Sequence, residues 1–139
     1  MNDAKLYNKS NALQKRDAQD IINKFAHVFE GASGKADQSL LDVGCGSGDV
    51  LAEVIVPKLS SKIVKVIGAD ISAEMIKYAS EKYRSKFLRF LKVDIESDFL
   101  PIKSQKITQT SVGQKQQLQL ESFNFITSFY CLHWIQNQR

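Results

Sequence analysis

The chain lacks the sequence features that carry a protein across or into a membrane. No apolar run in its 139 residues approaches the roughly 20 residues needed to span a bilayer. Its first residues, Met1 to Lys5, lack the apolar core of a secretory signal. We therefore expect no membrane span, and a hydrophobic content of 43% predicts one globular domain with its own core.

Cysteine and histidine are scarce. Cys45 and Cys131 are too few for a disulfide framework and do not have the spacing of a metal site. His27 and His133 are equally too few and too far apart to bind a metal. These residues predict no metal and favour the reducing cytoplasm.

The chain also lacks a strong excess of one charge. Its net charge of +4 is mild, and the basic residues between Lys82 and Lys92 are spread over an expected helix end and an expected strand. Such a distribution is typical of a solvated face rather than a nucleic-acid track. We therefore expect no nucleic-acid partner.

What the chain does have is a loop with glycine at every second position. The residues Leu40-Leu41-Asp42-Val43-Gly44-Cys45-Gly46-Ser47-Gly48-Asp49 form an apolar run, an acid and three alternating glycines. This order predicts a buried strand and then a tight loop, at the edge of the sheet where a following helix presents free N–H groups to a ligand. The dinucleotide fingerprint would need glycine at position 49, which is Asp49. The pattern therefore favours a nucleotide-like cofactor without a pyrophosphate.

Two more acids stand at the ends of expected strands. Asp70 follows a β-rich run about 20 residues past the glycine loop, where a carboxylate can accept hydrogen bonds from a ribose diol. It is equally a plausible helix-flanking acid, because Ser72 has the character of an N-cap. Asp94 closes another short apolar strand in the same way. Three strands that each end in an acid favour a cofactor site at one edge of a sheet.

Strand-like and helix-like segments alternate along the chain, which predicts an α/β fold: a Rossmann-like doubly wound parallel sheet with right-handed crossovers. An amphipathic pattern precedes them, with Leu13, Ile21, Ile22, Phe25, Ala26 and Phe29 as its apolar positions. Strands are expected at 39–43, 63–69, 87–93 and 123–129, with Cys131 in the last strand region; helices are expected at 10–30, from the glycine loop to Pro57, at 73–84, and in a final turn.

We expect a single partial domain over residues 1–139, with a helical cap at 1–34 and an α/β half at 35–139. The stretch 101–122 breaks the alternation, because it is polar and rich in glutamine. It is expected to be a loop or an insertion.

Four segments together resemble the insect juvenile hormone acid O-methyltransferase family. They are the start from Leu6 to Ala18, the glycine loop, Gly68 to Met75, and Ser128 to Trp134. The resemblance covers nearly the whole chain apart from 101–122. It implies an enzyme that uses S-adenosyl-L-methionine to methylate the carboxylate of a small lipid-like acid, such as juvenile hormone acid or farnesoic acid.

The resemblance assigns roles to individual residues. Gln14 and Trp134 would orient the substrate carboxylate with neutral donors, and His133 would shape the pocket wall. A buried aromatic plug and an exposed helix position are the alternatives for Trp134 and Gln14. The implied cofactor contacts are Asp42, Gly44, Gly46 and Gly48 around the methionine part, Asp70 at the ribose with Ile71 beside it, Asp94 and Ile95 at the adenine, and Ser128 facing the sulfonium.

The implied reaction needs no acid or base catalysis from the protein. A carboxylic acid is already ionised at neutral pH, so no general base is needed and the implied residues only position the reactants. Family members continue well beyond the segment that ends at Trp134, whereas this chain stops at Arg139. The resemblance thus implies four strands in the order 3-2-1-4, with the fourth strand as an open edge. We expect a fragment, a shortened product, or a chain whose partner covers that edge.

Three alternatives remain open. The first is a binding or regulatory module that holds the cofactor or pairs with a full-length relative without turnover. The second is a nucleic-acid methyltransferase, although the segment from Ser128 to Cys131 lacks the Asn/Asp-Pro-Pro-aromatic signature of base methylation. The third, a nicotinamide enzyme, is disfavoured by Asp49 in place of glycine.

Overall fold

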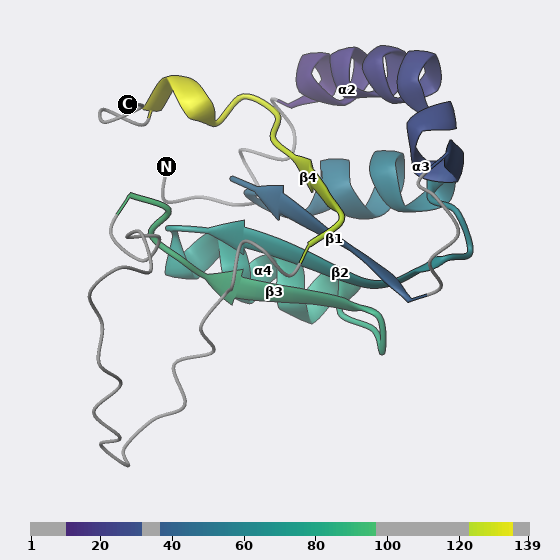
Figure 1. Ribbon diagram of the computed structural model, residues 1–139. Helices are drawn as coiled ribbons and strands as arrows, with labels where there is room; N and C mark the ends of the chain where they lie inside the picture. The colour runs from purple at the N-terminus through teal and green to yellow at the C-terminus, as the bar shows by residue number, and fades with distance from the viewer. Residues whose placement is uncertain (1–10, 32–36, 97–122, 135–139) are drawn as a thin grey trace.

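A computed structural model describes residues 11–31, 37–96 and 123–134 of the chain. Its centre is a four-stranded parallel sheet in the order β3-β2-β1-β4 (Figure 1). The α/β class and the predicted strand order 3-2-1-4 are therefore confirmed. The strands are β1 (Gln38–Val43), β2 (Ile63–Asp70), β3 (Leu88–Lys92) and β4 (Phe125–Thr127).

The fourth strand is shorter than its sequence predicts. Seven residues, 123–129, were expected to be extended, but β4 contains only three and pairs with β1 from Leu40 to Asp42. The expected strand position of Cys131 is wrong, because Cys131 lies after β4 and outside the sheet. Tyr130 has a left-handed backbone with φ of 55°, so the chain turns sharply there and cannot continue as a strand.

The N-terminal helical segment is divided in two. A single helix was expected up to Glu30, but α2 (Ala12–Phe25) ends at Phe25 with Ala26 as its C-cap, and α3 (His27–Gly31) follows. Only Ile22 of α2 and Phe29 of α3 are buried among the expected apolar positions, and Ala18, which was not expected, is buried with them. The prediction was wrong for Leu13, Ile21 and Phe25, which are about half exposed.

The helix after the glycine loop is irregular. Its middle, η1 (Leu51–Ile55), is a π-helix and its end, η2 (Val56–Lys58), is a 3₁₀-helix that contains Pro57. Proline cannot donate a backbone hydrogen bond, so the helix was expected to end near this residue, and it does. The next helix, α4 (Ala73–Tyr83), begins as predicted at Ser72, whose hydroxyl accepts from the N–H of Met75 at 3.3 Å. The last element is a short turn, η4 (Leu132–Trp134).

The core has two parts, one for each set of side chains that alternate along the strands. The first contains Leu40 and Val66 and is joined by buried residues of α2, α3, η1 and α4. The second contains Leu41, Val43 and Ile67 from the strands and has no helical residue among those described. The described helices therefore pack with one side of the sheet (Figure 1).

Two predictions fall on parts of the chain for which no structure is given. The expected loop or insertion at 101–122 lies outside the described residues, as do residues 1–10 and 32–34 of the expected helical cap at 1–34. None of the helices within the described ranges is both long enough and apolar enough to cross a membrane.

Candidate cofactor site

The glycine loop lies where the carboxyl ends of β1 and β2 meet. The backbone N–H groups of Gly44 and Cys45 both donate to the carbonyl of Ala69, at 2.7 and 3.0 Å. The loop then turns back on itself, with the N–H of Gly48 donating to the carbonyl of Cys45 at 3.0 Å. The loop is thus fixed to β2 before the following helix begins.

Packing within the protein explains two of the three glycines in the loop. Gly44 has φ of +75°, and a Cβ there would lie 2.3 Å from the Cβ of Cys131. Gly48 has φ of +80°, and a Cβ there would lie 2.8 Å from the ring of Phe90 and 2.9 Å from Ala79. Side chains at both positions are excluded by backbone conformation and by contact with distant segments. The sequence suggested that all three glycines serve the approach of a ligand, whereas two of them are required by the fold itself.

Asp70 fixes the middle of the loop. Its Oδ2 accepts from the N–H of Gly46 at 2.9 Å, and its Oδ1 accepts from the N–H of Ser72 at 2.9 Å. A carboxylate can accept about four hydrogen bonds, so each oxygen keeps a lone pair. Asp70 is only partly buried at the end of β2, so a diol could approach it. Its two predicted roles, cofactor acid and helix-flanking acid, are compatible in this arrangement.

Asp42 is buried beneath the loop. It is 3% exposed, and its Oδ1 accepts from the hydroxyl of Thr127 on β4 at 2.7 Å. Burial raises the pKa of Asp42 to about 7, and the negative charge of Asp70 acts in the same direction, while the bond from Thr127 opposes them. Asp42 therefore joins β1 to β4 as a buried carboxyl group whose pKa is raised toward neutrality.

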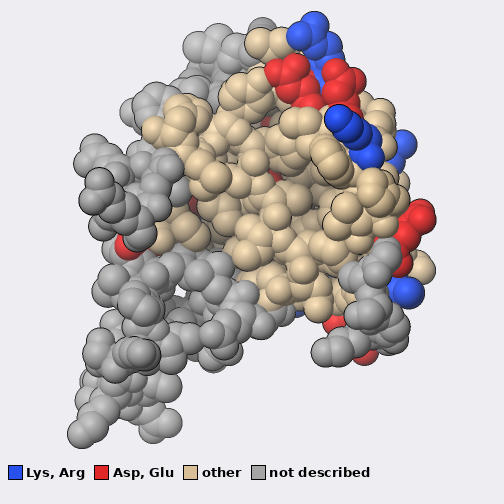
Figure 2. Space-filling view, turned by 45° about the horizontal axis from the view of Figure 1, so that its top comes forward, with Lys and Arg blue, Asp and Glu red and all other residues tan. Residues whose placement is uncertain are grey.

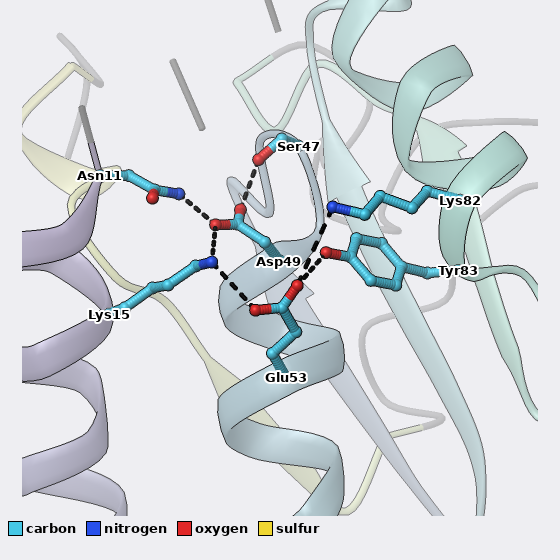
Figure 3. A network of polar contacts seen from close by, with 7 residues as sticks. All are labelled: Asn11, Lys15, Ser47, Asp49, Glu53, Lys82 and Tyr83. Atoms are coloured by element: carbon cyan, nitrogen blue, oxygen red, sulfur yellow. Dashed lines mark hydrogen bonds and ion pairs between the residues drawn. The ribbon is translucent and has the colours of Figure 1, made fainter. Parts of the chain in front are cut away.

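Asp49, directly after the loop, is the centre of a polar network (Figure 3). It is 1% exposed and accepts from the amide nitrogen of Asn11, the ammonium of Lys15 at 3.1 Å, and the hydroxyl of Ser47. Burial alone would raise the pKa of Asp49, but the donors Ser47, Asn11 and Lys15 outweigh it and lower that pKa. Asp49 thus joins the start of α2 to the glycine loop as an ionised carboxylate.

The same network continues outward to the surface. Lys15 also pairs with Glu53 at 2.9 Å, and Glu53 accepts from the hydroxyl of Tyr83 and lies 4.0 Å from the ammonium of Lys82 (Figure 3). The hydrogen bonds from Tyr83 and Lys15 lower the pKa of Glu53. This exposed part of the network joins α2 to α4, and it makes no contact with the glycine loop among those found in the described residues.

The remaining cofactor residues expected from the sequence lie along the same edge with different environments. Ser128 donates from its hydroxyl to the carbonyl of Val43 at 2.9 Å, so it joins β4 to β1 in this structure. Asp94 follows β3 and accepts from the N–H of Glu96 at 3.0 Å. Ile95 is partly buried against the second core cluster, and Ile71 is 61% exposed.

The three expected substrate residues come from two ends of the chain. Gln14 lies in the first turn of α2 and is partly buried. His133 lies in η4 and is exposed. Trp134 ends η4, and its side chain lies outside what the structure describes.

Sequence reasoning missed the residues that hold the loop from α2. Asn11 and Lys15 are four residues apart, the spacing that places two side chains on one face of a helix, and this was the available signal. Position 49 was considered only as a missing glycine, although an acid there can pair with a lysine. Thr127 gave no signal, because its partner Asp42 is 85 residues away.

The charges of this edge suit a cationic ligand. Asp42 and Asp70 approach the loop from two strands, and the nearby cation Lys15 is already paired with Asp49 and Glu53. A pyrophosphate would meet carboxylates here, whereas a sulfonium or an ammonium would be attracted by them. Within the described ranges no group of three histidine, cysteine, aspartate or glutamate side chains is arranged to hold a metal.

Comparisons with known proteins identify the type of domain. The family model described as a methyltransferase domain matches residues 11–139. The chain is 39% identical to juvenile hormone acid O-methyltransferase of Drosophila melanogaster and 36% identical to that of Bombyx mori, over 99% of this chain in each case. It spans only 41% and 43% of the length of these two relatives.

A solved structure supports the fold. A putative S-adenosyl-L-methionine-dependent methyltransferase of Methanococcus maripaludis superposes with a TM-score of 0.59 at 14% identity, covering 97% of this chain and 52% of that one. The cofactor of this type of domain is S-adenosylmethionine, and the acid-lined glycine loop fits that cation. The match over residues 11–139 shows that the chain belongs to the methyltransferase domain family.

Proposed function

We propose that the chain is the cofactor-binding part of an S-adenosylmethionine-dependent carboxyl O-methyltransferase that acts on a small lipid-like acid, of the juvenile hormone acid or farnesoic acid type. The observation that carries the proposal is the geometry of Asp70, which fixes Gly46 and Ser72 and still has lone pairs for a ribose diol. The names of the two insect relatives support the carboxyl acceptor.

The residues of the chain would bind and orient the cofactor. Asp70 would accept from the ribose hydroxyls, and Asp42 would lie beneath the methionine part and add negative potential when ionised. Gly46 would let the loop backbone pass close to the ligand, while Gly44 and Gly48 keep the loop in shape through their packing. Asp94 and Ile95 would flank the adenine.

The chemistry needs placement rather than proton transfer. When bound, the cofactor supplies an electrophilic methyl group on a sulfonium. A carboxylate substrate is ionised at neutral pH, so its oxygen can attack without a general base. Gln14 and Trp134 would orient that carboxylate with uncharged donors, and His133 would form part of the pocket wall. The protein therefore contributes alignment and exclusion of water.

A second candidate is a cofactor-binding or regulatory chain without turnover, and one observation favours it. An apolar cleft of about 790 Å³ lies between the N-terminal helices and β4, where Ile21, Phe25, Val28 and Ile126 are about half exposed. Figure 2 shows that charged side chains gather near the border of one face and leave its middle largely uncharged. A partner that covers the β4 edge would bury such a surface.

A methyl-transfer assay separates the two candidates. Purified chain is incubated with S-adenosylmethionine carrying a labelled methyl group and with farnesoic acid, alone and with a full-length insect relative. Labelled methyl ester formed by the chain alone supports the enzyme. Cofactor binding with no ester above the no-protein control supports the non-catalytic candidate, and a change in the relative's rate would indicate a regulatory partner.

The proposal includes a cytoplasmic location and a small-molecule acid as the substrate, with no nucleic-acid partner. The location is supported by Cys45 and Cys131, which are both free thiols. Binding of RNA or DNA that weakens with added salt would contradict the proposed substrate class.

A further inference from the structure

Asp49 connects two parts of the molecule that are far apart in sequence. Its carboxylate accepts from Asn11, the N-cap of α2, and from Lys15 in the first turn of α2, 38 and 34 residues earlier in the chain. It also receives the hydroxyl of Ser47, which lies between two glycines of the loop. All of these bonds converge on one side chain that is 1% exposed. The conformation of the loop and the position of α2 therefore depend on one buried charge.

The orientation of Asn11 shows how strictly this carboxylate organises its neighbours. Asn11 is 2% exposed, and its amide nitrogen donates to Asp49, which fixes which end of the amide faces the acid. Its Oδ1 is then buried without a hydrogen-bond partner among the described residues. A buried polar atom without a partner is costly, so bonding to Asp49 dominates at this position.

From these contacts we propose that Asp49 is a positioning residue for the cofactor, acting through Ser47 on the glycine loop and through Lys15 and Asn11 on α2. It does not itself touch the ligand. Its charge holds the loop in the conformation in which the N–H of Gly46 is bonded to Asp70. Asp70, the proposed partner of the ribose, and the loop backbone are therefore aligned before the ligand binds. The inference rests on the proposed cofactor site and adds a residue that no motif assigns to it.

The structure supplies a matched control. Glu53 lies four residues further along the same helix, is bonded to the same Lys15, and has a side chain that is 44% exposed. It differs from Asp49 in having no described contact with the loop. If the network only stabilised the fold, replacing either acid would lower the free energy of unfolding by different amounts and leave ligand affinity unchanged. If Asp49 positions the loop, its replacement lowers ligand affinity and the replacement of Glu53 does not.

The test is calorimetric titration with S-adenosylhomocysteine of the unmodified chain, Asp49→Asn and Glu53→Gln, together with urea unfolding of each. Asp49→Asn should weaken binding about tenfold, which corresponds to about 1.4 kcal/mol, because the loop would no longer be held in the conformation that is aligned with Asp70. Glu53→Gln should bind within twofold of the unmodified chain. Ile22→Val is a second control, because it removes a buried methyl group of α2 and lowers stability without touching the network. It should also bind within twofold of the unmodified chain.

Lys15 provides a second route if Asp49→Asn does not fold. Lys15→Met removes the cation that is paired with Asp49 and should weaken binding, whereas Lys15→Arg keeps the charge and should restore it. Equal affinity of Asp49→Asn and the unmodified chain overturns the inference and leaves the cofactor site intact. If Asp49→Asn is unfolded, equal affinity of Lys15→Met and Lys15→Arg overturns the inference instead. Absence of binding by the unmodified chain contradicts the proposed function itself.

Discussion

Two buried aspartates on either side of the glycine loop behave in opposite ways. Asp42, before the loop, has one neutral donor, Thr127, and burial raises its pKa to about 7. Asp49, after the loop, has three donors including the cation Lys15, and its pKa is lowered. Both side chains have almost no exposed surface, but Asp42 lies deeper in the protein than Asp49. The comparison teaches that depth and hydrogen-bond partners together decide whether an acid at this site is charged.

The two acids consequently hold different parts of the molecule. Asp42 joins β1 to β4 through a bond that survives when the acid is neutral. Asp49 joins the loop to α2 through bonds that need its charge. One end of the loop is therefore attached to the sheet and the other to the N-terminal helix.

The largest expected effect is the loss of the charge at position 49. At pH 6, Asp49→Asn should lower the free energy of unfolding by about 2–3 kcal/mol, because Lys15 loses its buried anionic partner and the amide keeps only one of the two acceptor oxygens that Ser47 and Asn11 use. Asp42→Asn should change it by less than about 1 kcal/mol, because Asp42 is mostly protonated at that pH. Urea unfolding of both variants measures the difference, and equal losses would contradict the comparison.

A smaller effect follows from pH. The pKa of Asp42 is raised above its unfolded value, so the stability that it contributes is present at low pH and is lost as the pH rises through about 7. Between pH 6 and 8.5 the unmodified chain should lose about 1.4 kcal/mol that Asp42→Asn does not lose. Urea midpoints measured at the two pH values test this. A constant gap between the two proteins would show that Asp42 is ionised throughout.

Removing the donor to Asp42 that the described residues supply, Thr127, tests the comparison further. Thr127→Val keeps the shape of the side chain but deletes the hydroxyl that favours the ionised acid. We expect a loss of about 1 kcal/mol at pH 8 and a smaller loss at pH 6, because an ionised buried carboxylate without a donor is the costlier state. Thr127→Ser restores the hydroxyl and is the control. A loss that is larger at pH 6 would contradict this assignment.

The smallest effect is expected at the exposed end of the network. Glu53→Gln should lower the free energy of unfolding by only a few tenths of a kcal/mol, because surface ion pairs contribute little. Added salt should reduce even this difference. Thermal unfolding at low and high salt is the measurement, and a loss as large as that of Asp49→Asn would mean that the network has no separate buried part.

The sequence predicted the sheet well because its signals are local. Apolar runs that end in Asp42 and Asp70, and the N-cap Ser72, each mark an element within a few residues. Faces were harder to predict: Leu13, Ile21 and Phe25 have helical spacing yet are about half exposed, since which side of α2 is covered depends on distant segments.

The site was predicted only in outline, because its contacts join residues that are far apart in the sequence. The glycines marked the loop, but Cys131 and Phe90, which forbid side chains at positions 44 and 48, lie 87 and 42 residues further along the chain. Asp49 in place of glycine argues against a dinucleotide site, but its identity alone does not predict its contacts with α2 and the loop. A buried charge is explained by its partners, and these come together only in the folded chain.

The most direct test of the account is the affinity of the chain for S-adenosylhomocysteine, measured by calorimetry beside Asp70→Ala. The account predicts saturable binding with one site per chain, and a loss of at least about tenfold when the acid that fixes Gly46 is removed. Absence of binding at millimolar ligand, or equal binding by Asp70→Ala, would contradict the assignment of this loop as the cofactor site.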